Sequence, residues 1–171
     1  MNGNSNKTIV DFTLPQNTVS WSYYIGVGQE GKAAYKTAEN KFIASAGKQL
    51  VKYMALGPMG LLAVSGVSLF NSVQGGDNVQ YWFLSDWNNV LLFQSGQAFQ
   101  QYKLGNVVND ASQMTFIPSG NKVYLGLLND NMIEPIEVIV KVSAVVVNSE
   151  WNTRPINKMR ITTSKLPFHA K

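Results

Sequence analysis

The sequence predicts a mainly β protein, an antiparallel β-sandwich or jelly roll that carries a two-helix insertion near residues 32–72. Three observations support this fold class. Apolar and polar residues alternate with a period of two over residues 18–27, which is the pattern of a strand. The period changes to that of a helix over residues 32–55 and then returns to two. In the second half of the chain, turn-forming residues separate short strand-like segments, as they do in sandwiches.

The strands are short and separated by turns. They are expected at residues 8–14, 18–27, 79–84, 90–93, 114–117, 122–128, 133–147 and 159–163. Two pairs are expected to form hairpins, because turn-forming Asp, Asn, Ser, Pro and Gly residues lie between their apolar segments. These pairs are 79–84 with 90–93, and 114–117 with 122–128. The alternation in residues 18–27 predicts a strand that is buried on one face.

Two helices are predicted between the second and third strands. Apolar residues such as Phe42, Ile43 and Leu50 recur at helical spacing, with lysines on the other side, until Gly57-Pro58 ends the pattern. The uncharged residues 59–70 are expected to form a short buried helix or an irregular apolar segment. Because helices normally bury their apolar faces internally, we expect both to cover one sheet or close one end of the sandwich.

Length and composition fit one domain. The chain has 171 residues, of which 45% are hydrophobic, so we expect a single sandwich over residues 8–171 after a flexible segment 1–7. Only 14% of residues are charged, against roughly 25% in an average soluble domain. The net charge is +4 and the basic residues are scattered, which argues against a nucleic-acid partner. The lack of cysteine excludes disulfides, thiol catalysis and thiolate metal sites.

Groups for acid–base or nucleophilic chemistry are scarce. The single histidine, His169, lies near the carboxyl end, where chains are usually poorly ordered. We therefore predict no catalytic residue, no metal ligand and no cofactor. Ten Asp and Glu residues leave a carbohydrate hydrolase open, because two carboxylates facing one pocket would suffice. Most of them lie in predicted turns, where their side chains stabilise the backbone.

The candidate binding residues are Asp86, Trp87, Asn88 and Asn89. They are expected to form an exposed hairpin tip that contacts a ligand, either a glycan or another protein. An exposed Trp can stack on a sugar ring while the neighbouring amides donate and accept hydrogen bonds. The alternative is that Trp87 folds back over the end of the sandwich and belongs to the core.

The apolar segment 57–70 allows a second kind of contact. Three lysines, Lys41, Lys48 and Lys52, lie on the helix before it. If the segment is exposed, it would contact a membrane surface or another copy of the chain. If it covers a sheet, it has no such role.

Residues 118–147 resemble the carboxyl ends of small exported jelly-roll modules. A turn with Gly120 leads to a strand at 123–128, then to Asn129-Asp130-Asn131, then to a long strand that includes residues 138–142. This order resembles the Golgi-dynamics (GOLD) domain and the bacterial prepeptidase C-terminal domain, and residues 80–86 are similar to their aromatic strand followed by an Asp turn.

The resemblance implies a β-sandwich that serves as an interaction or accessory module, and it carries over no functional residue. We therefore expect a non-catalytic binding or accessory domain of an exported or cell-envelope protein. A carbohydrate-active hydrolase and a membrane-surface or self-assembling structural module remain the alternatives.

Overall fold

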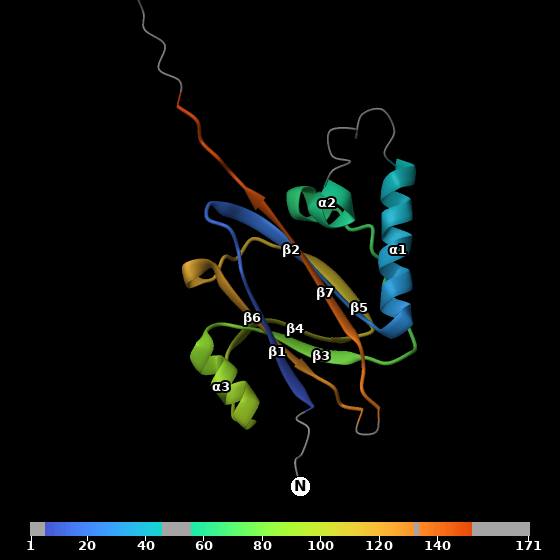
Figure 1. The fold of residues 1–171 in the computed structure, drawn as a ribbon, viewed down its shortest axis with the longest axis vertical. Coiled ribbons are helices and arrows are strands. Elements are labelled where there is room, and N and C mark those ends of the chain that lie inside the picture. The colour runs from blue at the N-terminus through green and yellow to red at the C-terminus, as the bar shows by residue number, and fades with distance from the viewer. Residues whose placement is uncertain (1–5, 46–55, 132–133, 152–171) are drawn as a thin grey trace, which may run out of the picture.

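The structure is a computed structural model, and it describes residues 6–45, 56–131 and 134–151. Over these ranges seven strands form two antiparallel sheets accompanied by three α-helices (Figure 1). The strands are β1 (Lys7–Thr13), β2 (Thr18–Val27), β3 (Val79–Leu84), β4 (Gln101–Val107), β5 (Asn109–Met114), β6 (Lys122–Leu128) and β7 (Val138–Val146). The helices are α1 (Gly28–Ser45), α2 (Gly57–Ser65), α3 (Trp87–Ser95) and the short 3-10 helix η2 (Ser119–Asn121).

The two sheets form the sandwich. In the part of the chain that the structure describes, one sheet has the strand order β1-β6-β3-β4 and the other β5-β2-β7. Their facing sides bury one apolar core, which is rich in aromatic rings because aromatic residues bury large areas. Its buried members are Leu14, Trp21, Tyr23, Ile25, Val27, Val79, Tyr81, Phe83, Val123, Leu125 and Leu127. The mainly β, sandwich-like fold class is confirmed.

The predicted two-helix insertion is also confirmed, because α1 and α2 both lie between β2 and β3. The first helix starts at Gly28, four residues before the predicted start, directly after β2. The part of the predicted helix at residues 46–55, which includes Leu50, lies outside the described residues.

Strand β2 is buried on both faces, so the prediction of a half-buried strand is wrong. Every residue from Trp21 to Val27 is buried. The side facing away from the core is covered by the helices: Ser22 Oγ donates to Met59 O of α2 at 2.7 Å, and Tyr24 Oη donates to Gly31 O of α1 at 2.6 Å. A Cβ on Gly31 would lie 2.5 Å from the carbonyl carbon of Gly26, so only glycine lets α1 approach β2 this closely.

The predicted hairpin of residues 79–84 and 90–93 is wrong. Strand β3 is present, but residues 87–95 form α3 in place of a turn and a second strand. The strands that pair with β3 are β4 and β6. The physical reason is that Asp86 accepts a hydrogen bond from Asn89 N at 2.9 Å and so caps a helix.

The second predicted hairpin is wrong as well. Residues 109–114 form β5, which pairs with β2, whereas β6 pairs with β1 and β3 in the other sheet. The connection between them therefore crosses from one sheet to the other and does not turn back within one sheet.

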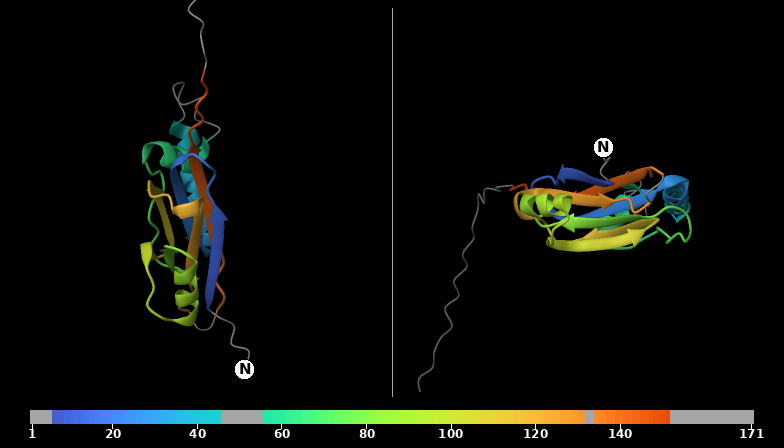
Figure 2. Two further views of the ribbon diagram at one scale, coloured as in Figure 1. Left: turned by 90° about the vertical axis from the view of Figure 1, so that its left-hand side faces the viewer. Right: turned by 90° about the horizontal axis from the view of Figure 1, so that it is seen from below.

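The two long sides of the sandwich differ. On one side, β4 and β5 are joined through Val108 alone, so the chain passes from one sheet into the other there. On the opposite side, β1 and β7 are the edge strands of their sheets (Figure 1; Figure 2). The long run predicted at 133–147 contains β7, and the strand predicted at 159–163 lies outside the described residues.

Candidate binding surface at Trp87 and Tyr124

The structure presents Trp87 on the first turn of a short helix that is fixed at both ends. At the amino end, Asp86 Oδ1 accepts hydrogen bonds from Asn89 N at 2.9 Å and from Asn89 Nδ2 at 3.0 Å. The Asn89 Oδ1 atom in turn accepts from Gln100 N at 2.6 Å, which ties the helix start to the chain before β4. Asp86 and Asn89 therefore hold the helix in place.

The carboxyl end of α3 is capped in two ways. Gly96 adopts the left-handed conformation, with φ of 73°, and its N–H bonds back to the last turn. The Lys7 ammonium group donates to Phe93 O at 2.7 Å, which places a positive charge at the negative end of the helix dipole. Because Lys7 belongs to β1, and not to the flexible segment predicted at 1–7, the contact ties α3 to an edge strand.

The inner face of α3 is buried against the outside of the four-stranded sheet. Val90 and Phe93 are buried there with Leu84. The Phe93 ring lies over Gly126 of β6, where a Cβ would come within 3.1 Å of it. Trp82, on the opposite face of β3 from Tyr81 and Phe83, packs against Phe93 with ring centroids 5.4 Å apart. The buried inner face and the two caps thus fix the position of the residues on the outer face of α3.

Trp87 lies on that outer face and is 53% exposed. Its ring contacts Tyr124 of β6, with centroids 5.8 Å apart and planes tilted by 54°. Lys122 lies 5.9 Å from the centre of the Tyr124 ring and forms an ion pair with Asp11 of β1, which raises the pKa of Lys122. We call the group formed by Trp87, Asn88, Tyr124, Lys122 and Asp11 the Trp87 surface.

Of the four predicted site residues, Asp86, Trp87 and Asn88 are exposed and Asn89 is buried. Asp86 also caps the helix through its Oδ1 atom. Tyr124, Lys122 and Asp11 were missed by the sequence analysis. A weak signal was present, because Lys122 and Tyr124 alternate with the buried Val123 and Leu125 and therefore point outward. The sequence could not place them beside Trp87, since the pairing of β6 with β3 is long-range.

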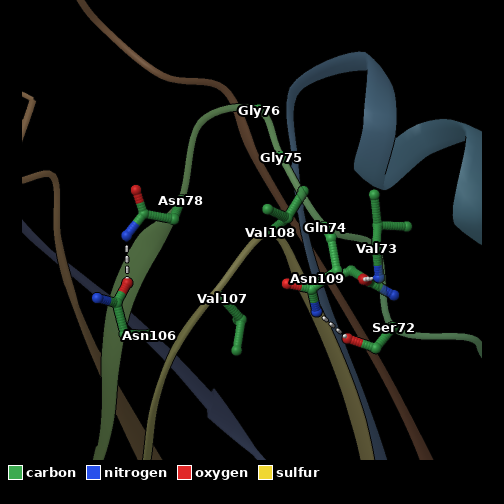
Figure 3. A pocket seen from close by; sticks show the side chains of 10 residues that line it. All are labelled: Ser72, Val73, Gln74, Gly75, Gly76, Asn78, Asn106, Val107, Val108 and Asn109. Carbon is green, nitrogen blue, oxygen red and sulfur yellow. Dashed lines mark hydrogen bonds between the residues drawn. The ribbon is translucent and has the colours of Figure 1, made fainter.

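A pocket of about 290 Å³ lies where the loop at 72–78 meets the β4–β5 corner (Figure 3). Its described lining includes no acidic, basic or aromatic side chain. The lining residues are Ser72, Val73, Gln74, Gly75, Gly76, Asn78, Asn106, Val107, Val108 and Asn109. Asn109 accepts from Val73 N at 2.8 Å and donates to Asn71 O at 2.9 Å, and Asn78 donates to Asn106. These amide hydrogen bonds hold the loop at 72–78 against the sheets.

A buried polar cluster joins the two sheets near the same corner. Tyr23 donates to Asp110 Oδ2 at 2.7 Å, Tyr81 donates to the same oxygen, and the two tyrosine hydroxyls lie 3.0 Å apart. Burial is the main cause that raises the pKa of both tyrosines, and the nearby Asp110 carboxylate raises both pKa values further. Both hydroxyls thus stay protonated, which suits a structural cross-link.

The segment predicted at 57–70 is divided between burial and exposure. Met59, Leu62 and Ala63 of α2 are buried against the β5-β2-β7 sheet, while Val64 and Val67 are exposed. No helix in the described ranges is both long and apolar enough to cross a bilayer. Among the same residues, no group of three His, Cys, Asp or Glu side chains lies close enough to hold a metal ion. His169 lies outside them.

No known protein family, curated protein sequence or solved structure matches this chain.

Proposed function

We propose that this chain is a non-catalytic binding domain of an exported or cell-envelope protein, and that it binds a glycan on the Trp87 surface. Its sandwich is the architecture that the resemblance to the GOLD and prepeptidase C-terminal jelly-roll modules implies, and modules of that kind serve interaction or accessory roles. The location outside the cytoplasm rests on that resemblance alone.

The observation that carries the proposal is the presentation of Trp87. Covering a large aromatic side chain with a partner is favourable in free energy, whereas leaving it in water does not stabilise the fold. Here the capped helix α3 holds Trp87 53% exposed and beside Tyr124. This fixed position lowers the conformational entropy that binding would cost.

The neighbours of Trp87 favour a glycan over a protein ligand. A sugar ring offers an apolar C–H face for stacking and hydroxyl groups around its edge. Asn88, Lys122 and Asp11 supply donors and acceptors beside the two rings. Because the rings are tilted by 54°, they cannot stack on one sugar together, and the surface suits two adjoining units of an oligosaccharide.

Five of the ten carboxylates, all of which lie in the described residues, make structural contacts, and this disfavours a hydrolase that would use them. Asp11 pairs with Lys122, Asp86 caps α3, Asp110 accepts from two tyrosines, Asp130 accepts from Gln80, and Glu137 pairs with Lys32. A glycosidase needs two carboxyl groups free to act on one substrate.

The direct test is binding to a panel of insoluble and soluble polysaccharides, namely chitin, cellulose, peptidoglycan and starch. We expect the unaltered chain to be retained by at least one of them. Trp87→Ala should weaken that binding by about 30-fold or more, the loss typical of a Trp at a binding hot spot. The melting temperature should change little, because the side chain is exposed.

Two control variants separate the Trp87 surface from exposed apolar residues in general. Leu91→Ala alters the same helix at a side chain that is 49% exposed, and Trp151→Ala removes a Trp that is 93% exposed elsewhere. Both should bind as the unaltered chain does. Failure of the chain to bind any of the polysaccharides, or full binding by Trp87→Ala, would contradict the proposal.

A further inference from the structure

Strand β7 differs from the other edge strands of the sandwich in its chemistry. The remaining edges carry features that discourage pairing with another chain. Four of the seven residues of β1 are polar or charged, β5 begins Asn109-Asp110, and β4 has a register irregularity opposite Phe83 and Leu84. Over its nine residues, β7 is apolar except for Lys141 and Ser143.

The side chains of β7 are incompletely covered. None of its nine residues is buried, although seven consecutive residues of the neighbouring β2 are. Val142 and Val146 are each 37% exposed, and Val147 beyond them is 49% exposed. The register between β2 and β7 is continuous from Val138 to Val145, so the strand presents a regular row of backbone N–H and C=O groups on its open side.

Lys141, the single charged residue of β7, does not block pairing at this edge. The Lys141 ammonium group lies 3.9 Å from the centre of the Tyr35 ring of α1. It is therefore drawn over the helix face of the sheet and away from the open edge. A charged side chain that stands at an edge deters pairing, and this one is engaged elsewhere.

We propose that β7 pairs with β7 of a second copy of the chain, antiparallel and about a two-fold axis at Val142. In that register Val138 faces Val146, Ile139 faces Val145, Val140 faces Ala144, and Lys141 faces Ser143. Every apolar residue meets an apolar residue, and no lysine meets a lysine. An axis at Lys141 would place the two lysines directly opposite each other, which is unfavourable.

The result is one continuous sheet with the strand order β5-β2-β7-β7-β2-β5. The interface uses the side of the sandwich where β1 and β7 are the edge strands, whereas α3 packs on the outer face of the other sheet (Figure 1; Figure 2). The dimer does not depend on the proposed glycan binding, and its tests need no ligand.

The first test is the mass of the full chain in solution, measured by light scattering from about 1 μM to about 1 mM, a range that spans weak and strong pairing. We expect a mass that rises to that of two chains. Loss of residues 152–171 should leave this behaviour unchanged. A full chain that stays monomeric while the shortened chain dimerises would mean that its own tail occupies the edge, and this overturns the proposal. Monomers in both cases overturn it too.

The second test fixes the register by a cross-link. The chain has no cysteine, so Val142→Cys introduces its only thiol. At the axis, this thiol faces its own counterpart at a Cβ separation of about 5 Å, close enough for a disulfide after small adjustments. Under mild oxidation we expect Val142→Cys to be linked into covalent dimers.

Val140→Cys is the matched control, on the same strand and the same face. Its counterpart would lie four residues away along the strands, about 13 Å, beyond the reach of a disulfide. It should give at least tenfold less dimer in the same time. Equal linking of the two variants, or none with Val142→Cys, would refute the proposed register and pairing.

Discussion

Two kinds of buried tyrosine hydroxyl occur between the sheets. The Tyr23 and Tyr81 hydroxyls share Asp110 as their acceptor and so connect β2, β3 and β5. The Tyr102 hydroxyl is buried and finds no hydrogen-bond partner within the described residues. A buried hydrogen bond to a carboxylate stabilises a fold, whereas a buried hydroxyl without a partner destabilises it.

The same substitution should therefore have opposite effects at these sites. We expect Tyr81→Phe to lower the free energy of unfolding by about 1.5–3 kcal/mol, because it removes a hydrogen bond to a charged acceptor. Tyr102→Phe should leave the stability unchanged or raise it by up to about 1 kcal/mol. Urea unfolding of both variants measures the difference. A larger loss for Tyr102→Phe than for Tyr81→Phe would show that these hydroxyl roles are wrongly assigned.

Helix α3 shows how one side chain decides the structure of an element. Asp is common both at hairpin turns and at helix N-caps, so Asp86 alone does not distinguish the two. The distinguishing signals are weaker: Val90 and Phe93 at helical spacing, and Gly96 at the position of a C-cap. Read together with Asp86, these signals predict the observed helix, whereas the apolar run at 90–93 alone suggests a strand.

Strands were predictable where their local pattern is strong. Strand β2 matches its predicted bounds, and the third and sixth strands were located correctly as well. Strands β4 and β5 were missed because Gln101–Val107 and Asn109–Met114 carry few apolar residues and become strands through pairing with β3 and β2. Their burial comes from partners distant in the sequence, which a local pattern does not contain.

The candidate site was predictable in part for the same reason. Trp87 was singled out by its polar neighbours, and it is exposed as expected. The contact between Trp87 and Tyr124 depends on sheet order. Strand β6 lies beside β3, and not beside β5 or β7, which are its neighbours in sequence. The burial of β2 on both faces likewise depends on where α1 and α2 pack. The alternation of residues within one strand does not reveal that packing.

At the scale of the whole molecule, buried tyrosines should set the alkaline limit of stability. Burial raises the pKa of Tyr24 to about 12 and raises the pKa values of Tyr23 and Tyr81 further. In the unfolded chain these groups titrate near pH 10. Between the unfolded-state pKa and the higher folded-state pKa of each tyrosine, the unfolded chain binds fewer protons than the folded protein. The free energy of unfolding therefore falls as the pH rises through this range.

We therefore expect full stability from this source below about pH 10 and a progressive loss above it, by about 1.4 kcal/mol per pH unit for each such tyrosine. Chemical unfolding at pH 8 to 12, with tyrosinate absorbance recorded in parallel, measures this dependence. Stability that stays constant to pH 12 would mean that the three hydroxyls ionise freely in the folded protein.

The central claim is that the glycan ligand binds at Trp87. The indole N–H signals of the tryptophans in an NMR spectrum test this claim most directly. The chain has four Trp residues, so four such signals are expected. Trp21 is an internal reference, because it is fully buried and its Nε1 donates to Phe116 O at 2.9 Å. Loss of one signal in Trp87→Phe assigns the Trp87 resonance. On titration with oligosaccharides of the polysaccharide that the chain binds, we expect the Trp87 signal to shift and the Trp21 signal to stay. A saturable shift confined to Trp151 or Trp82, with Trp87 unmoved, would contradict the account.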